Sequence, residues 1–159
     1  MNIKDDWDNI KLHFNKCYKS NLHVSVASVN QENIPTVTPI GSMFLNKNLT
    51  GFYFEKYISK IPEHSKLNKN ICVLIVNSNK WYWFKSLFIG KFKNYPAIKL
   101  YGILGEKRKA NSIESSRFAR RTKLSKGLKG YSYLWGKMDE VREITFYKAE
   151  KINLGQMTQ

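Results

Sequence analysis

The first twenty residues have the spacing of an amphipathic helix. Asp5, Asp6 and Asp8 stand where acidic residues favour a helix N-terminus. The apolar positions recur three or four residues apart: Trp7, Ile10, Phe14, Cys17 and Tyr18. We therefore predict a helix over about residues 5–19 that packs by this face on a larger body, with Cys17 as a packing residue.

From residue 22 the hydrophobic period changes to two, which is typical of strands. LHVSVASV (22–29) alternates from Leu22 onward. IPTVTPIGSMFL (34–45) is also extended, and its two prolines indicate an edge or bulged strand. After a further turn comes GFYFEK (51–56), which is rich in aromatic residues. The pattern predicts a three-stranded antiparallel meander with short connections.

The second half of the chain combines further strands with short helices. Pro62 fits the first turn of a short helix, from which His64 and Leu67 would face inward. Asn111 and Glu114 have the spacing of a capping box at the start of a helix over 111–124. Four other runs are strand-like: ICVLIV (71–76), the aromatic WYWFKSLFIGKF (81–92), AIKLYGIL (97–104) and VREITFYKAEKI (141–152).

These elements predict a mainly β (α+β) fold with about seven strands and two or three peripheral helices. Strands and helices do not alternate regularly, which argues against a doubly wound parallel sheet. A small antiparallel barrel with helices packed outside fits better. The 159 residues suffice for one full core and contain no internal repeat. We expect one domain over residues 1–159, with a barrel over about 21–152 after the N-terminal helix.

The charge balance favours an anionic partner, which would be nucleic acid, a phosphate-bearing cofactor or an acidic membrane surface; a solvated basic surface is the alternative. Lys and Arg number 27 against 12 Asp and Glu, which gives a formal net charge of +15. The densest basic stretch, residues 105–130, contains nine Lys and Arg against two Glu. Two interpretations stay open for this stretch: it binds nucleic acid or another polyanion, or it is an ordinary solvated surface.

Several classes of function lack the motifs that they require. The three histidines are not spaced as metal ligands, and two cysteines exclude a zinc cluster or a disulfide scaffold, so we expect no metal site. Nucleophile-elbow, dinucleotide-binding and P-loop patterns are absent. The N-terminus lacks the apolar core of a signal peptide, and the longest apolar run, residues 71–76, is too short for a membrane span. We expect a cytoplasmic protein with no membrane partner.

Two segments carry candidate binding chemistry. Ser59 and Lys60 precede a short helix whose N-terminus would favour a phosphate, and Lys56 adds a cation at the end of the preceding strand. In a strand, Trp81 and Trp83 share one face, which would line a flat conjugated ligand or an interface. Core packing is the alternative for both tryptophans.

ASVNQENIPTVTPIGSMF (27–44), GFYFEKYISK (51–60) and ICVLIVN (71–77) together resemble the pyridoxamine 5′-phosphate oxidase-related family of FMN-binding split barrels. The similarity extends over about residues 20–150. It implies a split β-barrel and a homodimer in which each FMN lies at the interface between the chains.

The resemblance also implies roles for individual residues. Ser59 and Lys60, with Lys56 nearby, would hold the flavin phosphate, while Phe54 and Glu55 would lie beside the ribityl chain and the ring edge. The other implied residues offer backbone groups to the isoalloxazine, cover it from the partner chain, or contact flavin or substrate late in the sequence: Pro39, Ile40, Gly41, Ser42, Trp81, Trp83, Trp135 and Arg142.

The chain departs from the true oxidases in two places. Ser59-Lys60 stands where they have Arg-Lys, and the Arg and Lys of their second strand have no counterpart in TVTPIGSMF. We therefore expect an FMN-dependent oxidoreductase with an unassigned substrate, in which FMN supplies the redox chemistry and no side chain is a catalytic acid or base. The alternatives are an F420-binding reductase and a non-enzymatic basic barrel that binds nucleic acid or another polyanion. A haem-handling role would have His64 as its one conceivable ligand.

Overall fold

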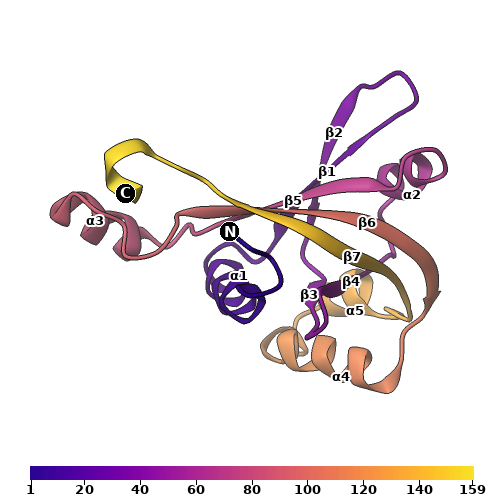
Figure 1. Cartoon of the computed structure of the whole chain (residues 1–159). Helices are drawn as coiled ribbons and strands as arrows, with labels where there is room; N and C mark the ends of the chain where they lie inside the picture. Colours follow the sequence, from indigo (N-terminus) through magenta and orange to yellow (C-terminus); the bar gives the residue numbers. More distant parts are fainter.

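A computed structural model describes residues 1–159 and contains one antiparallel sheet of seven strands, in the order β2-β1-β5-β6-β7-β4-β3 (Figure 1). The strands are β1 (Val24–Val29), β2 (Pro35–Ile40), β3 (Met43–Leu45), β4 (Thr50–Phe54), β5 (Asn70–Val76), β6 (Ala97–Lys109) and β7 (Glu140–Lys151). The longest two, β6 and β7, pair along most of their length and form the centre of the curled sheet. The predicted antiparallel split-barrel fold with peripheral helices is confirmed.

The helices lie around this sheet. They are α1 (Trp7–Asn21), α2 (Lys60–Ser65), α3 (Lys80–Ile89), α4 (Ser112–Arg121) and α5 (Gly130–Trp135), with short 3₁₀ turns at Lys123–Ser125 and Gly155–Thr158. Because α3 joins β5 to β6 and α4–α5 join β6 to β7, the two groups lie at opposite ends of β6 (Figure 1). No helix is long and apolar enough to cross a membrane.

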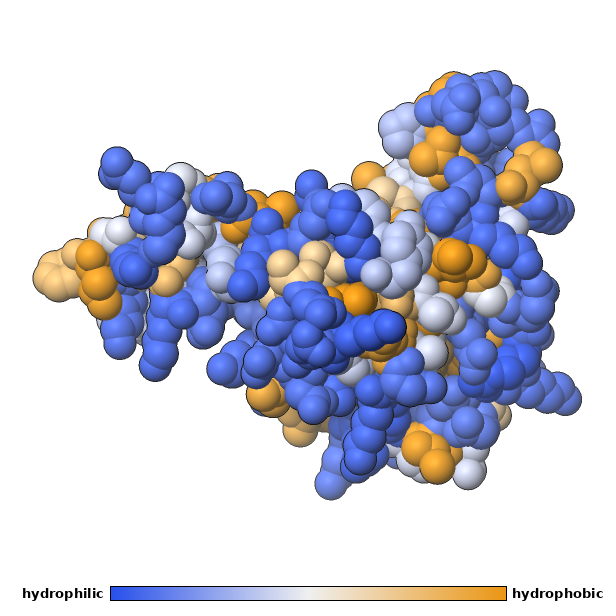
Figure 2. Space-filling view, viewed as in Figure 1, coloured by the Kyte–Doolittle hydropathy of each residue, from blue (hydrophilic) through white to orange (hydrophobic).

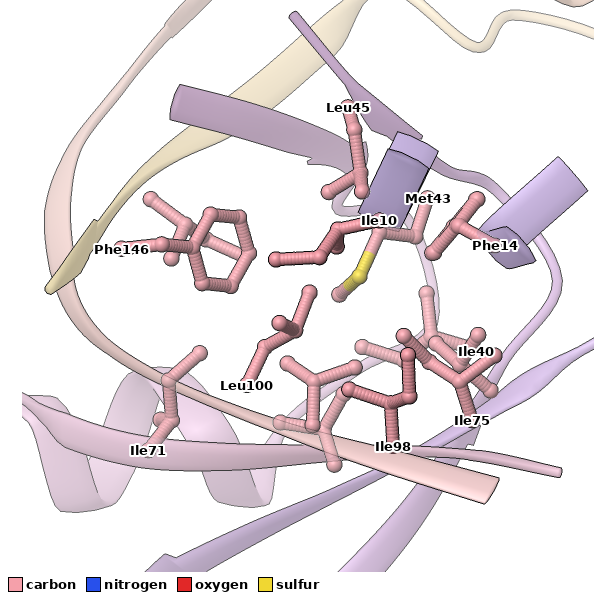
Figure 3. Close-up of a cluster of buried hydrophobic side chains, with 14 of the residues drawn as sticks. Ile10, Phe14, Ile40, Met43, Leu45, Ile71, Ile75, Ile98, Leu100 and Phe146 are labelled. Atoms are coloured by element: carbon pink, nitrogen blue, oxygen red, sulfur yellow. The ribbon is translucent and has the colours of Figure 1, made fainter. Parts of the chain in front are cut away.

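The main core forms where the sheet curls around α1. Figure 3 shows Ile10 and Phe14 of this helix facing side chains from β2, β3, β5, β6 and β7. The cluster comprises 22 buried residues, and Cys17 is one of them, as predicted. Burial raises the pKa of the Cys17 thiol to about 12, so this thiol stays protonated and unreactive near neutral pH.

A smaller core holds α4 against the sheet. It consists of five buried residues: Phe44, Phe52, Phe54, Phe118 and Val141. The rings of Phe54 and Phe118 lie 4.8 Å apart and join β4 to the helix. The capping box predicted for α4 is confirmed, because the Asn111 side chain accepts from the Glu114 N–H and the Glu114 carboxylate accepts from the Asn111 N–H.

The predicted meander over residues 22–56 is wrong. The run 34–45 divides at a bend, so β2 pairs with β1 while β3 pairs with β4. The two hairpins consequently lie at opposite edges of the sheet. Pro35 and Pro39 do lie in an edge strand, as predicted. An edge strand tolerates proline because it forms hydrogen bonds to a neighbour on one side only. Leu22 belongs to neither strand face; it ends α1 with φ 60° and is exposed.

The predicted strand over 81–92 is also wrong, because these residues form α3. The Asn79 side chain caps the helix by accepting from the Tyr82 N–H, and Gly90 ends it with φ 73°. Aromatic residues favour strands on average, but these two terminal signals determine the local structure. In α2, His64 is buried as predicted, whereas Leu67, just beyond the helix, is 63% exposed rather than facing inward.

Candidate functional site

A cavity of about 300 Å³ lies where three segments meet: the bend after β2, the end of β4 and the region of α5. Seven of the thirteen residues predicted from sequence line it: Pro39, Ile40, Gly41, Ser42, Phe54, Lys56 and Trp135. Four others complete the lining, namely Tyr57, Ile58, Leu134 and Met138. The structure thus brings together, from distant parts of the chain, most of the residues that the family resemblance selected.

The bend between β2 and β3 is tied to the end of β4. The Ser42 hydroxyl donates to the Phe54 carbonyl at 3.1 Å and accepts from the Phe54 N–H at 3.2 Å. The Tyr18 hydroxyl of α1 donates to the Gly41 carbonyl. A Cβ at position 41 would lie 3.3 Å from the Leu22 carbonyl oxygen, so contact with the end of α1 also favours glycine there.

Free backbone donors occur in two of the cavity segments. The peptide N–H groups of Gly41 and Ser42 make no hydrogen bond within the chain, and neither do those of Lys56, Tyr57 and Ile58. These residues follow directly after β2 and β4, where ladder pairing has ended. Unpaired N–H groups beside an apolar surface suit a flat ligand with carbonyl or phosphate oxygens.

Lys56 joins the end of β4 to α5 and the residue that follows it. Its ammonium donates to the carbonyls of Tyr133 and Gly136, and the neighbouring Tyr57 hydroxyl also donates to the Tyr133 carbonyl. Trp135 packs edge-on against Tyr131, with ring centres 5.5 Å apart. Lys56 remains exposed, so it positions α5 and still offers positive charge at the cavity.

Glu55 and Arg142, two predicted site residues, bind each other instead of lining the cavity. The Arg142 guanidinium donates to the Glu55 carboxylate at 2.6 and 3.0 Å and to the Gly105 carbonyl at 3.0 Å. The Tyr53 hydroxyl donates to the same carboxylate at 2.9 Å. Hydrogen bonding to Glu55 raises the pKa of Arg142, and burial raises that of Tyr53. This buried network holds β4 against β7.

Ser59 and Lys60 follow the cavity wall but do not line it. Both are exposed, and the Ser59 side chain makes no capping hydrogen bond to α2. The Lys60 ammonium pairs with the Glu63 carboxylate at 3.1 Å, which lowers the pKa of Glu63. Ser59 and Lys60 are therefore free to turn toward a phosphate at little cost, since an exposed ion pair contributes little to stability.

Trp81 and Trp83 lie on α3, at the end of β6 opposite the cavity (Figure 1). As helical residues they do not share a face as they would in a strand. The Trp83 indole donates to the Asn77 carbonyl and packs on Phe92, whereas Trp81 is 77% exposed. Neither residue lines the cavity of its own chain.

The basic stretch 105–130 is less available to a polyanion than its composition suggests. Arg108 is paired with Glu114 and Glu143, at 2.7 and 2.5 Å. Arg117 donates to the Leu45 carbonyl, and Arg121 donates to that of Met43. Both also lie over the Phe44 ring, at 5.0 and 3.5 Å. These three arginines hold α4 on the sheet.

His64 lies at a separate cavity of about 190 Å³, formed with residues 30–32, Glu63 and Leu67. Its Nδ1 is 2.9 Å from the Ser28 hydroxyl, and the residue is 5% exposed. The structure contains no group of three or more His, Cys, Asp or Glu side chains arranged to hold a metal ion.

Sequence reasoning missed Tyr57, Ile58, Leu134 and Met138. Tyr57 and Ile58 directly follow the predicted site residues Phe54, Glu55 and Lys56, so their place in the sequence could have indicated that they line the cavity too. Leu134 and Met138 enter the cavity because α5 folds over it, and the sequence-based prediction contained no helix at α5. The hydrogen bonds from Lys56 and Tyr57 to the Tyr133 carbonyl place α5 beside the end of β4, and these contacts are visible only in the structure.

Comparison with solved structures identifies the class of fold. An FMN-binding protein from Syntrophomonas wolfei matches with TM-score 0.60 and 10% identity, over 97% of this chain and 97% of that one. A Listeria innocua protein assigned to the pyridoxamine 5′-phosphate oxidases matches with TM-score 0.53 and 18% identity, over 92% and 97%. The haem storage protein HutZ from Vibrio cholerae matches with TM-score 0.55 and 10% identity, over 91% and 92%. An F420 reductase also matches.

The chain has the split-barrel fold of the pyridoxamine 5′-phosphate oxidase-like and FMN-binding proteins, as the family resemblance of its sequence implied. At these identities the likeness shows the fold alone. No protein-family model matches the sequence, and no curated protein matches it.

Proposed function

We propose that the cavity between β2, β4 and α5 binds FMN and that the protein is a flavin-dependent oxidoreductase. One observation carries this proposal: seven residues selected by the family resemblance, from three separate segments, line one cavity. The cavity has apolar side chains for the ring, unpaired peptide N–H groups for its oxygens and an exposed ammonium at Lys56. Pockets that bind cofactors have this composition.

When bound, FMN supplies hydride and electron transfer. The chain would orient the ring between the bend at Gly41–Ser42 and the Trp135 side chain, and would exclude water through Ile40, Phe54 and Met138. Peptide N–H groups and Lys56 would stabilise negative charge on the ring or its phosphate. No carboxylate or histidine lines this cavity, so the proposed chemistry uses no side-chain acid or base of the same chain.

We further propose that two chains pair and that each completes the other's cavity. The volume of about 300 Å³ is at the low end for a cofactor site, so one chain would cover only part of the flavin. Five of the lining residues are exposed in the single chain, namely Pro39, Gly41, Lys56, Tyr57 and Leu134. A second chain over this edge would bury them.

Two other cofactors are alternatives for the same fold. F420 has an anionic tail that would suit the positive charge of this protein, and an F420 reductase is among the structural matches. Haem is the second, because HutZ shares the fold. His64 lies at the separate 190 Å³ cavity with Nδ1 already bonded, so haem ligation by this histidine would use a different site.

The experiment is the visible absorption spectrum of the purified protein, before and after addition of FMN and desalting. A retained flavin spectrum, lost in Trp135→Ala but kept in Leu124→Ala, an exposed residue outside the cavity, supports the proposal. We expect Trp135→Ala to weaken FMN binding about tenfold or more, because it removes a large apolar contact. Equal retention in Trp135→Ala would place the flavin elsewhere, and a protein that retains F420 or haem in preference to FMN would replace the proposed cofactor.

A further inference from the structure

Helix α3 exposes five large apolar side chains. We name this surface the α3 outer face and define it by these side chains with their exposed fractions: Trp81 (77%), Phe84 (61%), Leu87 (64%), Phe88 (86%) and Ile89 (61%). Figure 2 shows hydrophobic side chains at the tip of this projecting helix, beside long hydrophilic ones. Contiguous exposed apolar surface of this kind marks an interaction site.

The opposite face of α3 is packed, so the exposure does not come from a frayed helix. The Tyr82 and Trp83 rings contact Phe92, with centres 5.6 and 5.2 Å away. Ser86 is buried, and the Phe92 N–H donates to the Met157 carbonyl at 2.8 Å. The helix therefore has one face attached to its own chain and presents the other outward. Trp81, Phe84 and Phe88, spaced i, i+3 and i+7, lie along the exposed side.

The charge around this face has one sign. The segment 80–93 contains Lys80, Lys85, Lys91 and Lys93, which are exposed and form no ion pair. The sequence has no acidic residue between Glu63 and Glu106. Two copies of this face would bring lysines together without carboxylates of the segment to pair with them. Nucleic acid would match the lysines but would leave exposed Leu87 and Ile89 without a favourable environment.

We propose that α3 is a peripheral docking site for an anionic phospholipid bilayer. Its Trp81, Phe84 and Phe88 side chains enter the boundary between headgroups and acyl chains, and the lysines lie against the negative headgroups. Exposed aromatic and aliphatic residues framed by lysines are the composition of helices that lie in a membrane interface. This proposal replaces two sequence-based expectations, that of no membrane partner and that of Trp81 covering the flavin from the partner chain. It does not depend on the proposed flavin function.

The test is co-sedimentation of the full chain with vesicles of phosphatidylcholine alone and of phosphatidylcholine mixed with phosphatidylglycerol. We expect binding to the mixed vesicles only, weakened by added salt. The double variant Trp81→Ser/Phe88→Ser is expected to lower partitioning about tenfold or more, since it removes two interfacial side chains. The matched control, Leu124→Ser/Leu128→Ser, changes exposed residues elsewhere and is expected to bind as the unaltered chain does.

Three results would overturn the proposal: no binding by the unaltered chain, unchanged binding by the Trp81/Phe88 variant, or equal loss in the control variant. Circular dichroism of each variant checks that it folds. Sedimentation equilibrium and FMN retention are measured alongside. A Trp81/Phe88 variant that loses self-association or flavin, with its vesicle binding unchanged, would assign the face to a second copy of the chain instead.

Discussion

At the end of β6 that carries α4 and α5, three arginines, Arg108, Arg117 and Arg121, are bonded to protein groups, and the phenylalanine rings of the smaller core are buried. At the other end, α3 exposes its apolar residues beside lysines that have no partner. Arg121, for example, donates to the Met43 carbonyl and stacks on two rings, whereas Lys85 is exposed and forms no ion pair. Positive charge on these three arginines therefore serves the fold, whereas the lysines around α3 remain available to a partner, a distinction that net charge alone cannot make.

The largest expected effect on stability comes from breaking the network of Tyr53, Glu55 and Arg142 near the cavity. Glu55→Ala leaves Arg142 buried without its carboxylate, and we expect a loss of about 4 kcal/mol in the free energy of unfolding, measured by urea denaturation. The control is Glu63→Ala, which breaks the exposed pair with Lys60 and should change stability by less than about 0.5 kcal/mol. A similar loss of unfolding free energy in Glu55→Ala and Glu63→Ala would mean that water reaches the Glu55–Arg142 pair in solution.

A second prediction compares two phenylalanines at the α3 end. Phe92 is 6% exposed and contacts two rings, so Phe92→Ala should lower the free energy of unfolding by about 3 kcal/mol. Phe88 is 86% exposed, and Phe88→Ala should change it by less than about 0.5 kcal/mol. Thermal and urea unfolding measure both. If Phe88→Ala proves as destabilising, its side chain is covered in solution.

The third prediction concerns pH. Hydrogen bonds from Arg108 lower the pKa of Glu114 below its ordinary value of 4.5. A lowered folded-state pKa means that this stabilisation is fully present above the unfolded value and is lost as pH falls through the folded one. Urea unfolding at a series of acidic pH values should show stability falling below about pH 4.5, and Glu114→Gln should flatten that fall. An unchanged pH profile in Glu114→Gln would assign the fall to other carboxylates.

The smallest expected effect is that of Lys60→Ala on the affinity for FMN. If Lys60 turns from Glu63 to the FMN phosphate, the variant should bind FMN several-fold more weakly while its free energy of unfolding stays within about 0.5 kcal/mol. Fluorescence titration with FMN measures the affinity, and Lys66→Ala, an exposed lysine just after α2, is the control. Equal affinities in both variants would remove Lys60 from the proposed site.

Local signals in the sequence predicted the elements that depend on neighbouring residues. The apolar spacing of Ile10, Phe14 and Cys17 predicted α1, and the Asn111–Glu114 capping box predicted the start of α4. The same kind of signal was present at Asn79 and Gly90 but was outweighed by the aromatic run, so α3 was predicted as a strand. That error also placed Trp81 and Trp83 on one face, which a helix separates.

The sequence by itself determined the strands β1, β4, β5, β6 and β7, because periodicity and turn residues are local properties of the chain. Its resemblance to a known family gave the split-barrel class and selected the residues around Gly41, Phe54 and Lys56. Only the tertiary structure decided which strands pair, since β2 and β3 are nearly contiguous in sequence yet lie at opposite edges of the sheet. It also decided that Glu55 and Arg142 bind each other, because the register sets Tyr53 opposite Arg142 across β4 and β7. Pairing, burial and the partners of charged groups depend on residues far apart in the chain, and sequence spacing carries no information about those distances.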